Sequence, residues 1–175
     1  CGVEVTEKKV RRERMGHIAL TVPVAHIWYF KSAPNKIAAM LGIPAKKLEA
    51  VIYYEKYIVL NQGASEWPKL ELITEEEYLE TLDKLPDNQN LAEDDPAKFK
   101  AEMGASAIHY LLKEIDVDAV ARELRAKMAK ETSQQRKAEA LKRLSIVKWF
   151  QESKGINRPE WMIHNVIPVI PPDLR

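Results

Sequence analysis

Two clusters of basic side chains are the most distinctive polar feature of this sequence. The first is the stretch 8–14 (KKVRRER), which holds five basic residues and one acidic residue. The second runs from Arg122 to Lys154, with ten basic and four acidic residues. Lysine and arginine bind phosphate groups without reading bases, so either cluster could hold the backbone of a nucleic acid. A solvated protein surface is the alternative for both.

An acidic stretch lies between the two basic clusters. From Glu71 to Glu102 the sequence has eleven acidic and three basic residues. The opposite charges nearly cancel, and the formal net charge of the chain is only +1. A net charge this small indicates no partner by itself, whereas the segregation of charge is more suggestive. For the acidic stretch we favour a solvated surface.

No residue pattern predicts an enzyme active site or a metal site. The sequence has no glycine-rich phosphate loop, no pair of histidines at helical spacing and no nucleophile motif. Glu55 and the run Glu75–Glu77 could supply an acid and a base, but such glutamates are common on helix surfaces. The four histidines are dispersed, and we expect each to be a hydrogen-bonded structural residue. They are His17, His26, His109 and His164.

The single cysteine, Cys1, excludes an internal disulfide bond. A lone thiolate cannot hold a structural zinc ion either, because such a site needs four ligands. A chain that starts at a cysteine without methionine is typical of a processed lipoprotein or of a segment from a longer chain. Since Gly2–Thr6 (GVEVT) alternates like a strand and not like a flexible tether, we favour the segment.

Composition favours an ordered domain, and the pattern of elements along the chain predicts the α+β class. The 175 residues suffice for one domain of ordinary size or one with an appendage. Hydrophobic residues make up 46% of the chain, enough for a real core. No apolar run reaches the roughly 18 residues of a membrane span.

The elements expected in the first part of the chain alternate between extended and helical. Residues 17–30 (HIALTVPVAHIWYF) are β-branched and aromatic and predict extended segments with a bend at Pro23. Helices are predicted from after Ser32 to Gly42 and over 45–52, which follow a proline. A strand is expected over 54–61.

A turn, a helix and a loop are expected next. Gln62–Ala64 has the composition of a turn. Thr74 and Glu77 form a capping-box pattern and predict a helix over 75–82. Residues 86–96 are polar, bounded by prolines and without periodicity, and predict a loop.

The clearest pattern predicts an antiparallel helical hairpin over 116–154. Its first helix is indicated by Val117, Val120, Ala121, Leu124 and Met128, which recur at helical spacing. Thr132 or Ser133 would cap the second helix, and Gly155 would end it. Apolar residues of the second helix are Leu141, Leu144, Val147 and Trp149 or Phe150. Four basic residues fall early in that helix and are expected near the tip of the hairpin: Arg136, Lys137, Lys142 and Arg143.

The last part of the chain, residues 157–175, predicts an extended segment. Its apolar run ends in Pro168, Pro171 and Pro172, which lack amide donors and suit an edge strand or a departing chain. We interpret the stop after Arg175 as a cut in a longer protein.

Five stretches in order resemble one protein family. They are CGVEVT (1–6), VRRERMGHI (10–18), PVAHIWYFKS (23–32), AEMGASAIHYLL (101–112) and RPEWMIHNVIPVIPPDLR (158–175). Together they are similar to the beta prime subunits of bacterial DNA-dependent RNA polymerases. The resemblance covers the whole chain and is weakest between about Asn61 and Lys98.

The resemblance implies a segment of the clamp, the part of the polymerase that closes over DNA. Residues 1–16 would be the edge of a zinc ribbon with a basic segment. Residues 17–115 would form the clamp body with the acidic loop 86–96, and 116–154 the hairpin of the clamp head. Residues 155–175 would return toward the lid.

The resemblance also implies what chemistry to expect. Cys1 matches the last of four zinc-binding cysteines of the family, so it would bind zinc in the full-length subunit only. The catalytic magnesium site of the family lies in a later segment. We therefore expect no bound cofactor and no catalytic residue in this chain, although the whole enzyme is a nucleotidyltransferase.

The expected partners follow from the same resemblance. They are DNA, nascent RNA, the beta, alpha and omega subunits and sigma factor, in the cytoplasm with the nucleoid and without a membrane. Duplex DNA is the expected partner of Arg136, Lys137, Lys142 and Arg143. Nascent RNA or nearby DNA is the expected partner of Lys8, Lys9, Arg11, Arg12 and Arg14. The alternatives are an independent or lipidated partner-binding module and a small hydrolase that uses the dispersed histidines and glutamates.

Overall fold

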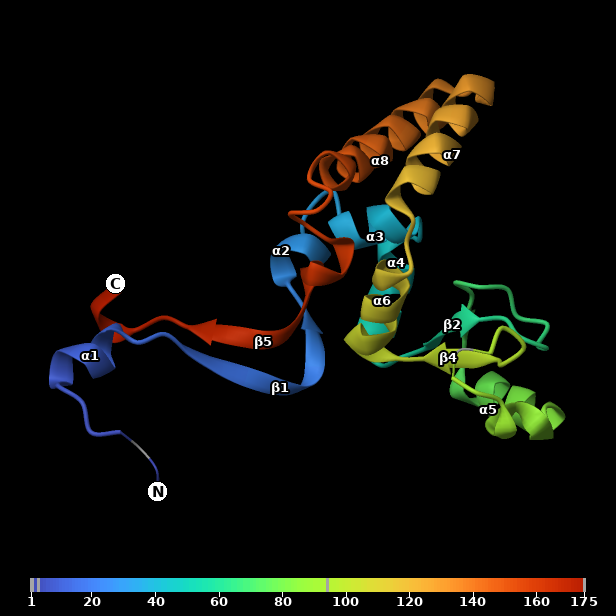
Figure 1. The fold of residues 1–175 in the computed structure, drawn as a ribbon. Helices are drawn as coiled ribbons and strands as arrows, with labels where there is room; N and C mark the ends of the chain where they lie inside the picture. Colours follow the sequence, from blue (N-terminus) through green and yellow to red (C-terminus); the bar gives the residue numbers. More distant parts are fainter. Residues whose placement is uncertain (1, 3, 94, 175) are drawn as a thin grey trace.

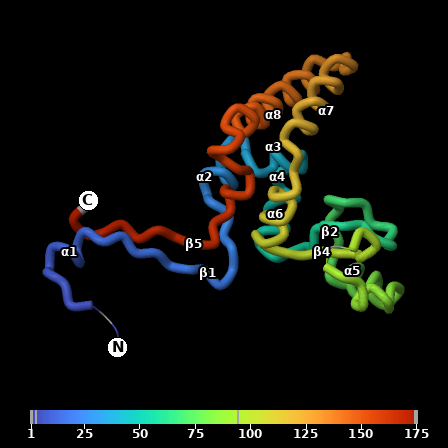
Figure 2. The backbone as a smooth tube through the Cα atoms, viewed as in Figure 1, coloured from blue at the N-terminus to red at the C-terminus, as the bar shows by residue number. Residues whose placement is uncertain are grey.

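The chain folds into a two-stranded ribbon, a helical centre with a projecting hairpin, and a small sheet (Figure 1). The computed structural model describes residues 2, 4–93 and 95–174. About 52% of the chain is helix and 17% is strand, in small antiparallel sheets, which confirms the predicted α+β class. The first and last described residues lie at the far end of the ribbon, near a short helix over residues 8–13 and away from the other helices (Figure 2).

The ribbon pairs β1 (Gly16–Ala25) with β5 (Ile163–Val169) in antiparallel fashion. Gly16 lies opposite Val169 and Ala25 opposite Ile163, with an irregular register between Ala19 and Val24. Pro23 lies in this irregular part, where its missing amide donor costs no ladder hydrogen bond. Extended structure is thus confirmed for residues 17–25 and 163–169, whereas 159–162 and 172–174, also predicted as extended, form 3-10 turns.

Two predictions for the N-terminal part are wrong. Gly2 and residues 4–7 have no regular secondary structure, and the chain instead enters the short helix α1 (Lys8–Glu13). Val3, which belongs to the predicted strand, lies outside the described residues.

The second wrong prediction concerns α2 (Ile27–Phe30), which is a helical turn although its residues favour extended structure. The backbone amide of Trp28 donates to Nδ1 of His26 at 3.1 Å, which caps the turn. The Phe30 side chain is only 5% exposed, and its burial in the core overrides the local β propensity.

The core is built around α6 (Gly104–Lys113), against which α3 (Lys36–Leu41), α4 (Ala45–Ile52) and the ribbon pack. The predicted end of α3 and the bounds of α4 are confirmed, because Gly42 ends α3 in a left-handed conformation and Pro44 precedes α4. The predicted start of α3 directly after Ser32 is wrong, since the helix begins at Lys36 after Asn35, whose side chain caps it. The large side chains buried completely here come from several elements and include Ile37, Met40, Leu48, Ile58, Ile108 and Leu112.

A second, smaller core lies under the sheet β3-β2-β4, formed by Leu72–Ile73, Tyr57–Asn61 and Lys100–Glu102. Helix α5 (Glu75–Lys84) follows β3 and begins with the predicted capping box. The Thr74 amide donates to the Glu77 carboxylate at 2.7 Å, and the Glu77 amide donates to the Thr74 hydroxyl at 3.3 Å.

The predicted loop 86–96 contains a 3-10 turn, η1 (Pro86–Asn90), and is anchored to the small sheet. Its buried Asn88 side chain donates to the Phe99 carbonyl at 3.0 Å and accepts from the Phe99 amide at 2.7 Å. The loop is therefore held by a specific contact, although Asp94 within it lies outside the described residues.

The predicted hairpin is confirmed as α7 (Val117–Lys130) packed against α8 (Gln134–Glu152). Ser133 occupies the predicted cap position before α8, but its side chain makes no capping hydrogen bond, while Asp116 caps α7 through its carboxylate. The apolar face of α8 differs from the prediction at Leu141, which is 56% exposed, whereas of the alternatives Trp149 and Phe150 it is Phe150 that is buried. The buried residues of α8 are Leu144, Ile146, Val147 and Phe150. The chain then passes through η2 (Pro159–Met162) to β5 and ends in η3 (Pro172–Leu174).

Leucine-to-alanine changes at two sites test the position of the core. Leu112 on α6 is 1% exposed and Leu141 on α8 is 56% exposed. We expect Leu112→Ala to lower the free energy of unfolding by about 3 kcal/mol, because it leaves a cavity. Leu141→Ala removes the same atoms from the surface and should change it by less than about 0.5 kcal/mol. Urea unfolding of both variants measures the difference, and equal losses would contradict this core.

Candidate nucleic-acid interface

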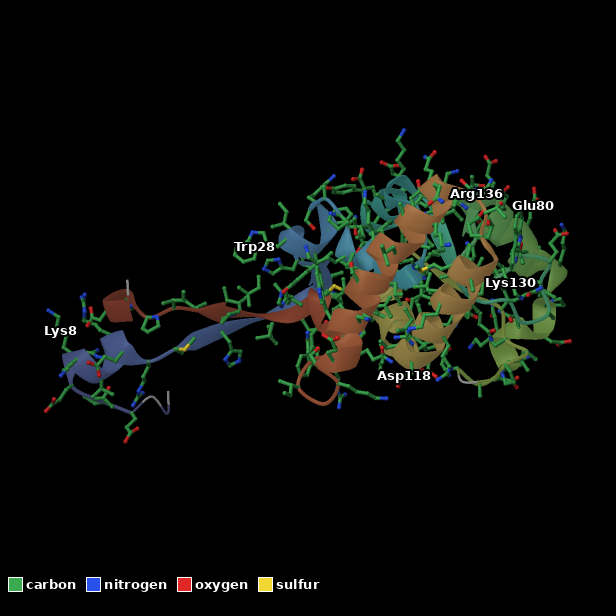
Figure 3. The ribbon with its side chains drawn as sticks, turned by 90° about the horizontal axis from the view of Figure 1, so that it is seen from above. Lys8, Trp28, Glu80, Asp118, Lys130 and Arg136 are labelled. Atoms are coloured by element: carbon green, nitrogen blue, oxygen red, sulfur yellow. The ribbon has the colours of Figure 1, made fainter. Side chains whose placement is uncertain are left out.

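The two basic clusters lie at opposite ends of the molecule. Figure 3 shows Lys8 at the far end of the ribbon, whereas Lys130 and Arg136 lie on the hairpin. The fold therefore does not combine them into one surface, and each has to be considered by itself.

The tip of the hairpin gathers basic residues from both helices. Arg136 and Lys137 lie in the first turn of α8, as predicted, and are exposed. Lys127 and Lys130 lie in the last turn of α7 and are exposed beside them, because the helices are antiparallel. Within the described residues, none of the four makes an ion pair with an acidic side chain.

Lys127 and Lys130 were not predicted as site residues. The predicted hairpin could have revealed them, because a hairpin places the last turn of its first helix next to the first turn of its second helix. We name these four side chains the tip cluster: Lys127, Lys130, Arg136 and Lys137.

The prediction that Lys142 and Arg143 crowd near the tip is wrong. A helix rises about 1.5 Å per residue, so Arg143 lies roughly 13 Å along α8 from Gln134. Lys142 is exposed in the middle of the helix, whereas Arg143 is half-buried. Nε of Arg143 donates to the Ala39 carbonyl at 2.6 Å, and Nη2 donates to the Met40 carbonyl at 3.3 Å. Burial lowers the pKa of the Arg143 guanidinium below its ordinary value.

In the N-terminal cluster, one arginine is also used within the chain. The Arg12 guanidinium donates to both carboxylate oxygens of Asp173, with Nε at 2.8 and 3.1 Å, and thereby ties α1 to η3. Lys9 lies 3.8 Å from Glu13 on an exposed face, a contact of small energetic value. The remaining predicted residues, Lys8, Arg11 and Arg14, are exposed.

At the base of the hairpin, Asp118 joins the start of α7 to the end of α8. Its carboxylate accepts from Lys154 Nζ and from Gln151 Nε2, each at 2.6 Å. The hydrogen bond from Lys154 lowers the pKa of Asp118 most, and the bond from Gln151 lowers it further. The contact with Asp118 in turn raises the pKa of Lys154. Lys154 thus serves the hairpin and not the basic surface.

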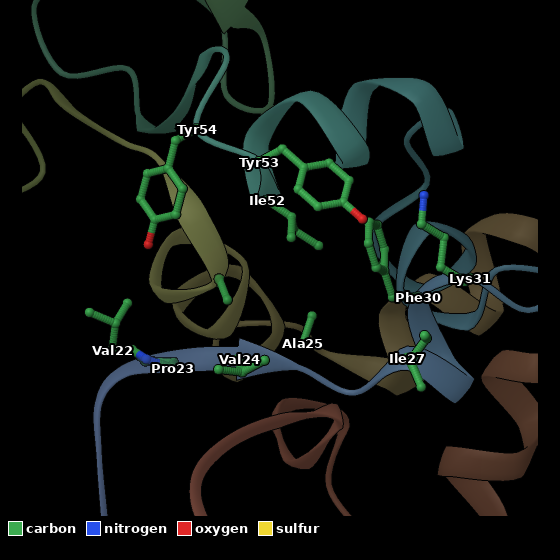
Figure 4. A pocket seen from close by; sticks show the side chains of 11 residues that line it. Val22, Pro23, Val24, Ala25, Ile27, Phe30, Lys31, Ile52, Tyr53 and Tyr54 are labelled. Atoms are coloured by element: carbon green, nitrogen blue, oxygen red, sulfur yellow. The ribbon is translucent and has the colours of Figure 1, made fainter.

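An apolar pocket of about 420 Å³ lies between β1, α2 and α4, with Phe30, Tyr53 and Tyr54 on its wall (Figure 4). Its described lining does not bring together an acid and a base. Lys31 is its one charged lining residue among those described, and its Nζ is 3.0 Å from the Glu49 carboxylate. The rest of the lining is mostly apolar.

The histidines and glutamates considered at first are not assembled into a site. His26 is hydrogen-bonded as expected, but Nε2 of His164 is buried without a partner within the described residues. The rings of these two histidines lie 5.1 Å apart. Glu55 and Glu75 are exposed on separate elements.

Neither a group of metal-binding side chains nor a membrane-spanning helix occurs in the described part of the chain. Residues 2, 4–93 and 95–174 contain no group of three or more His, Cys, Asp or Glu side chains placed to share a metal ion. None of their helices has both the length and the apolar character that crossing a membrane requires. Cys1, predicted to bind zinc in the full-length subunit, lies outside the described residues.

Comparison with known proteins defines the class of this chain. The family model described as RNA polymerase Rpb1, domain 1, matches residues 1–175, and the chain belongs to that family.

The similar proteins are subunits beta' of DNA-directed RNA polymerase. The subunit of Porphyromonas cangingivalis is 63% identical over 99% of this chain and 15% of its own length. That of Phocaeicola vulgatus is 60% identical over 100% of this chain and 12% of its length. That of Flavobacterium johnsoniae is 58% identical over 100% and 13%. The resemblance found in the sequence is thus confirmed, and the chain spans between 12 and 15% of these relatives.

The pairing at Asp118 predicts a pH-dependent contribution to stability. Because the folded pKa is lowered, this contribution is complete above the ordinary aspartate pKa of about 3.9. It is lost as the pH falls through the lowered value. At pH 7 we therefore expect Asp118→Asn to lower the midpoint of thermal unfolding, and the deficit to shrink below about pH 4.

Asp83→Asn is a suitable control, because Asp83 is exposed on α5. Thermal unfolding of the variants at pH 7, 5 and 3 measures the deficit. A deficit that stays constant down to pH 3 would contradict the role given to the Asp118 carboxylate.

Proposed function

We propose that this chain is part of the clamp of a bacterial DNA-directed RNA polymerase and helps to hold DNA during transcription. The observation that carries the proposal is the tip cluster, in which two helices present four exposed basic side chains together. The names of the relatives, subunits beta' of DNA-directed RNA polymerase, support the same function.

The chemistry of the tip cluster suits the phosphate backbone of duplex DNA. A polymerase must accept every sequence, and lysine and arginine bind phosphates without base readout. At the same tip, Glu131 Oε1 accepts from the amides of Thr132 and Ser133, each at 3.1 Å. The positive charge of the tip therefore comes from the four basic side chains and not from a helix end. Lys142, exposed further along α8, would extend the contact along the helix.

Arg143 and Arg12 were predicted to contact nucleic acid, and we leave both outside this proposal. Each already donates to oxygen atoms of its own chain, so binding a phosphate would first require breaking those bonds. The prediction for these two residues stays a prediction.

For the N-terminal cluster we propose contact with nascent RNA or nearby DNA. The support is that α1 presents Lys8, Lys9 and Arg11 on an exposed helix, attached to η3 through Arg12. Arg14 lies directly after this helix and is exposed too.

The activity of the complete enzyme is also a proposal for this chain. Nucleotidyl transfer, with its magnesium ions, would come from other parts of the subunit together with the beta, alpha and omega subunits and sigma factor. Cys1 would bind zinc with three further cysteines of the full-length subunit. We place this complex in the cytoplasm with the nucleoid. Residues 1–175 of this chain all match a segment of polymerase subunits, which disfavours the lipidated surface module and the small hydrolase.

Charge reversal at the tip cluster tests the proposal in the whole polymerase. We expect Arg136→Glu with Lys137→Glu to shorten the lifetime of promoter complexes. The slope of log lifetime against log salt concentration should also become shallower, because two phosphate contacts are lost. Filter binding over a range of salt concentrations measures both.

The matched control reverses two exposed lysines away from the hairpin, Lys46→Glu with Lys84→Glu, and changes the net charge equally. This control should leave lifetime and slope close to those of the unchanged enzyme. Equal effects of the two double variants, or no effect of either, would refute the contact at the tip.

A second test concerns α1. Replacing Lys8, Lys9 and Arg11 with alanine should increase the loss of labelled transcript from halted elongation complexes as salt is raised, since phosphate contacts are removed. Loss of transcript before template DNA assigns the cluster to RNA, and simultaneous loss assigns it to DNA. Unchanged retention of both strands would exclude the cluster as a contact.

A further inference from the structure

We propose that Arg143 is a positioning residue that sets the direction of the hairpin by joining α8 to the C-terminal end of α3. The inference rests on the proposed function, because the tip cluster then meets DNA in a fixed place. It separates Arg143 from its basic neighbours, whose side chains point to solvent.

The bonds of Arg143 use carbonyl groups that a helix leaves free. The last carbonyls of α3 lack partners within the helix and form its partially negative end. Nε reaches Ala39 at 2.6 Å and Nη2 reaches Met40 at 3.3 Å, so one planar guanidinium holds two successive carbonyls. A lysine has a single terminal nitrogen and cannot reproduce this fork.

Gly42 provides the space for this contact. It adopts φ +74°, and a Cβ at this position would lie 2.5 Å from Nη2 of Arg143 and 2.7 Å from Cζ. The guanidinium therefore lies where any other side chain at position 42 would have to go. Gly42 thus serves both the end of α3 and the attachment of α8.

The surroundings make Arg143 the polar point of an apolar interface. Leu144, Ile146 and Val147 are buried next to it on α8, and Ile37 and Met40 are completely buried on α3. Apolar contacts resist separation but permit sliding, whereas two directed hydrogen bonds fix one arrangement. Since Arg143 lies mid-helix, a small rotation of α8 here is amplified at the tip cluster.

The position of the hairpin is measured directly in the whole polymerase. Dyes on unnatural amino acids at Gln135, next to the tip, and at Glu80, on α5, report their distance by single-molecule energy transfer. We expect Arg143→Ala and Arg143→Lys to broaden the distance distribution and to shorten promoter-complex lifetime several-fold. Lys148→Ala, which removes an exposed charge from the same helix, should change neither.

Gly42→Ala gives an independent variant, because it displaces the guanidinium while Arg143 is retained. It should reproduce the broadened distribution. Adding Gly42→Ala to Arg143→Ala should broaden it little further, since the clash is then absent, and this non-additive result separates a specific contact from two unrelated losses of stability.

The possible outcomes distinguish this inference from the proposed function. An unchanged distance distribution in Arg143→Ala, or full restoration by Arg143→Lys, overturns the positioning role and favours a charge contact with DNA. A broadened distribution with unchanged lifetime supports the positioning role and counts against DNA binding by the tip cluster.

Discussion

The pairing of β1 with β5 is the constraint on which the rest of the structure depends. It brings Gly16 opposite Val169, so the chain between the strands must return to the point from which it left. The helical centre, the hairpin and the small sheet are all built within this closed excursion (Figure 1). Because the ribbon is long and narrow, it also holds α1 and η3 away from the hairpin and separates the two basic clusters.

Some basic residues of this chain hold its elements together, whereas others are exposed and available to a partner. Arg12, Arg143 and Lys154 each bond to an oxygen of the chain and join elements distant in sequence. The tip cluster has no such bonds among the described residues and remains available to a partner. Charge counted along the sequence does not make this distinction, because it depends on whether a carbonyl or carboxylate lies within reach in the folded state.

Elements whose sequence signals lie within a few residues could be predicted from the sequence. The Thr74 capping box, the Gly42 helix end and the apolar spacing of α7 specified their elements without tertiary contacts. Contacts between distant elements could not. The turn at α2 depends on burial of Phe30, and Leu141 is exposed because α8 turns other residues toward α7 and α3. The sequence placed Arg143 in one group with the exposed basic residues beside it. Its two carbonyl partners belong to a helix 104 and 103 residues earlier, so the local sequence does not reveal the contact.

The central claim, that the tip cluster lies against DNA, is tested most directly by crosslinking. A photoreactive amino acid is placed at position 137 of the full-length subunit, and at position 80 on α5 as a reference. Promoter complexes with labelled DNA are then irradiated. The account predicts a crosslink to DNA from position 137 and none from position 80. Complexes that still initiate transcription but give no crosslink from position 137, or equal crosslinks from both positions, would contradict it.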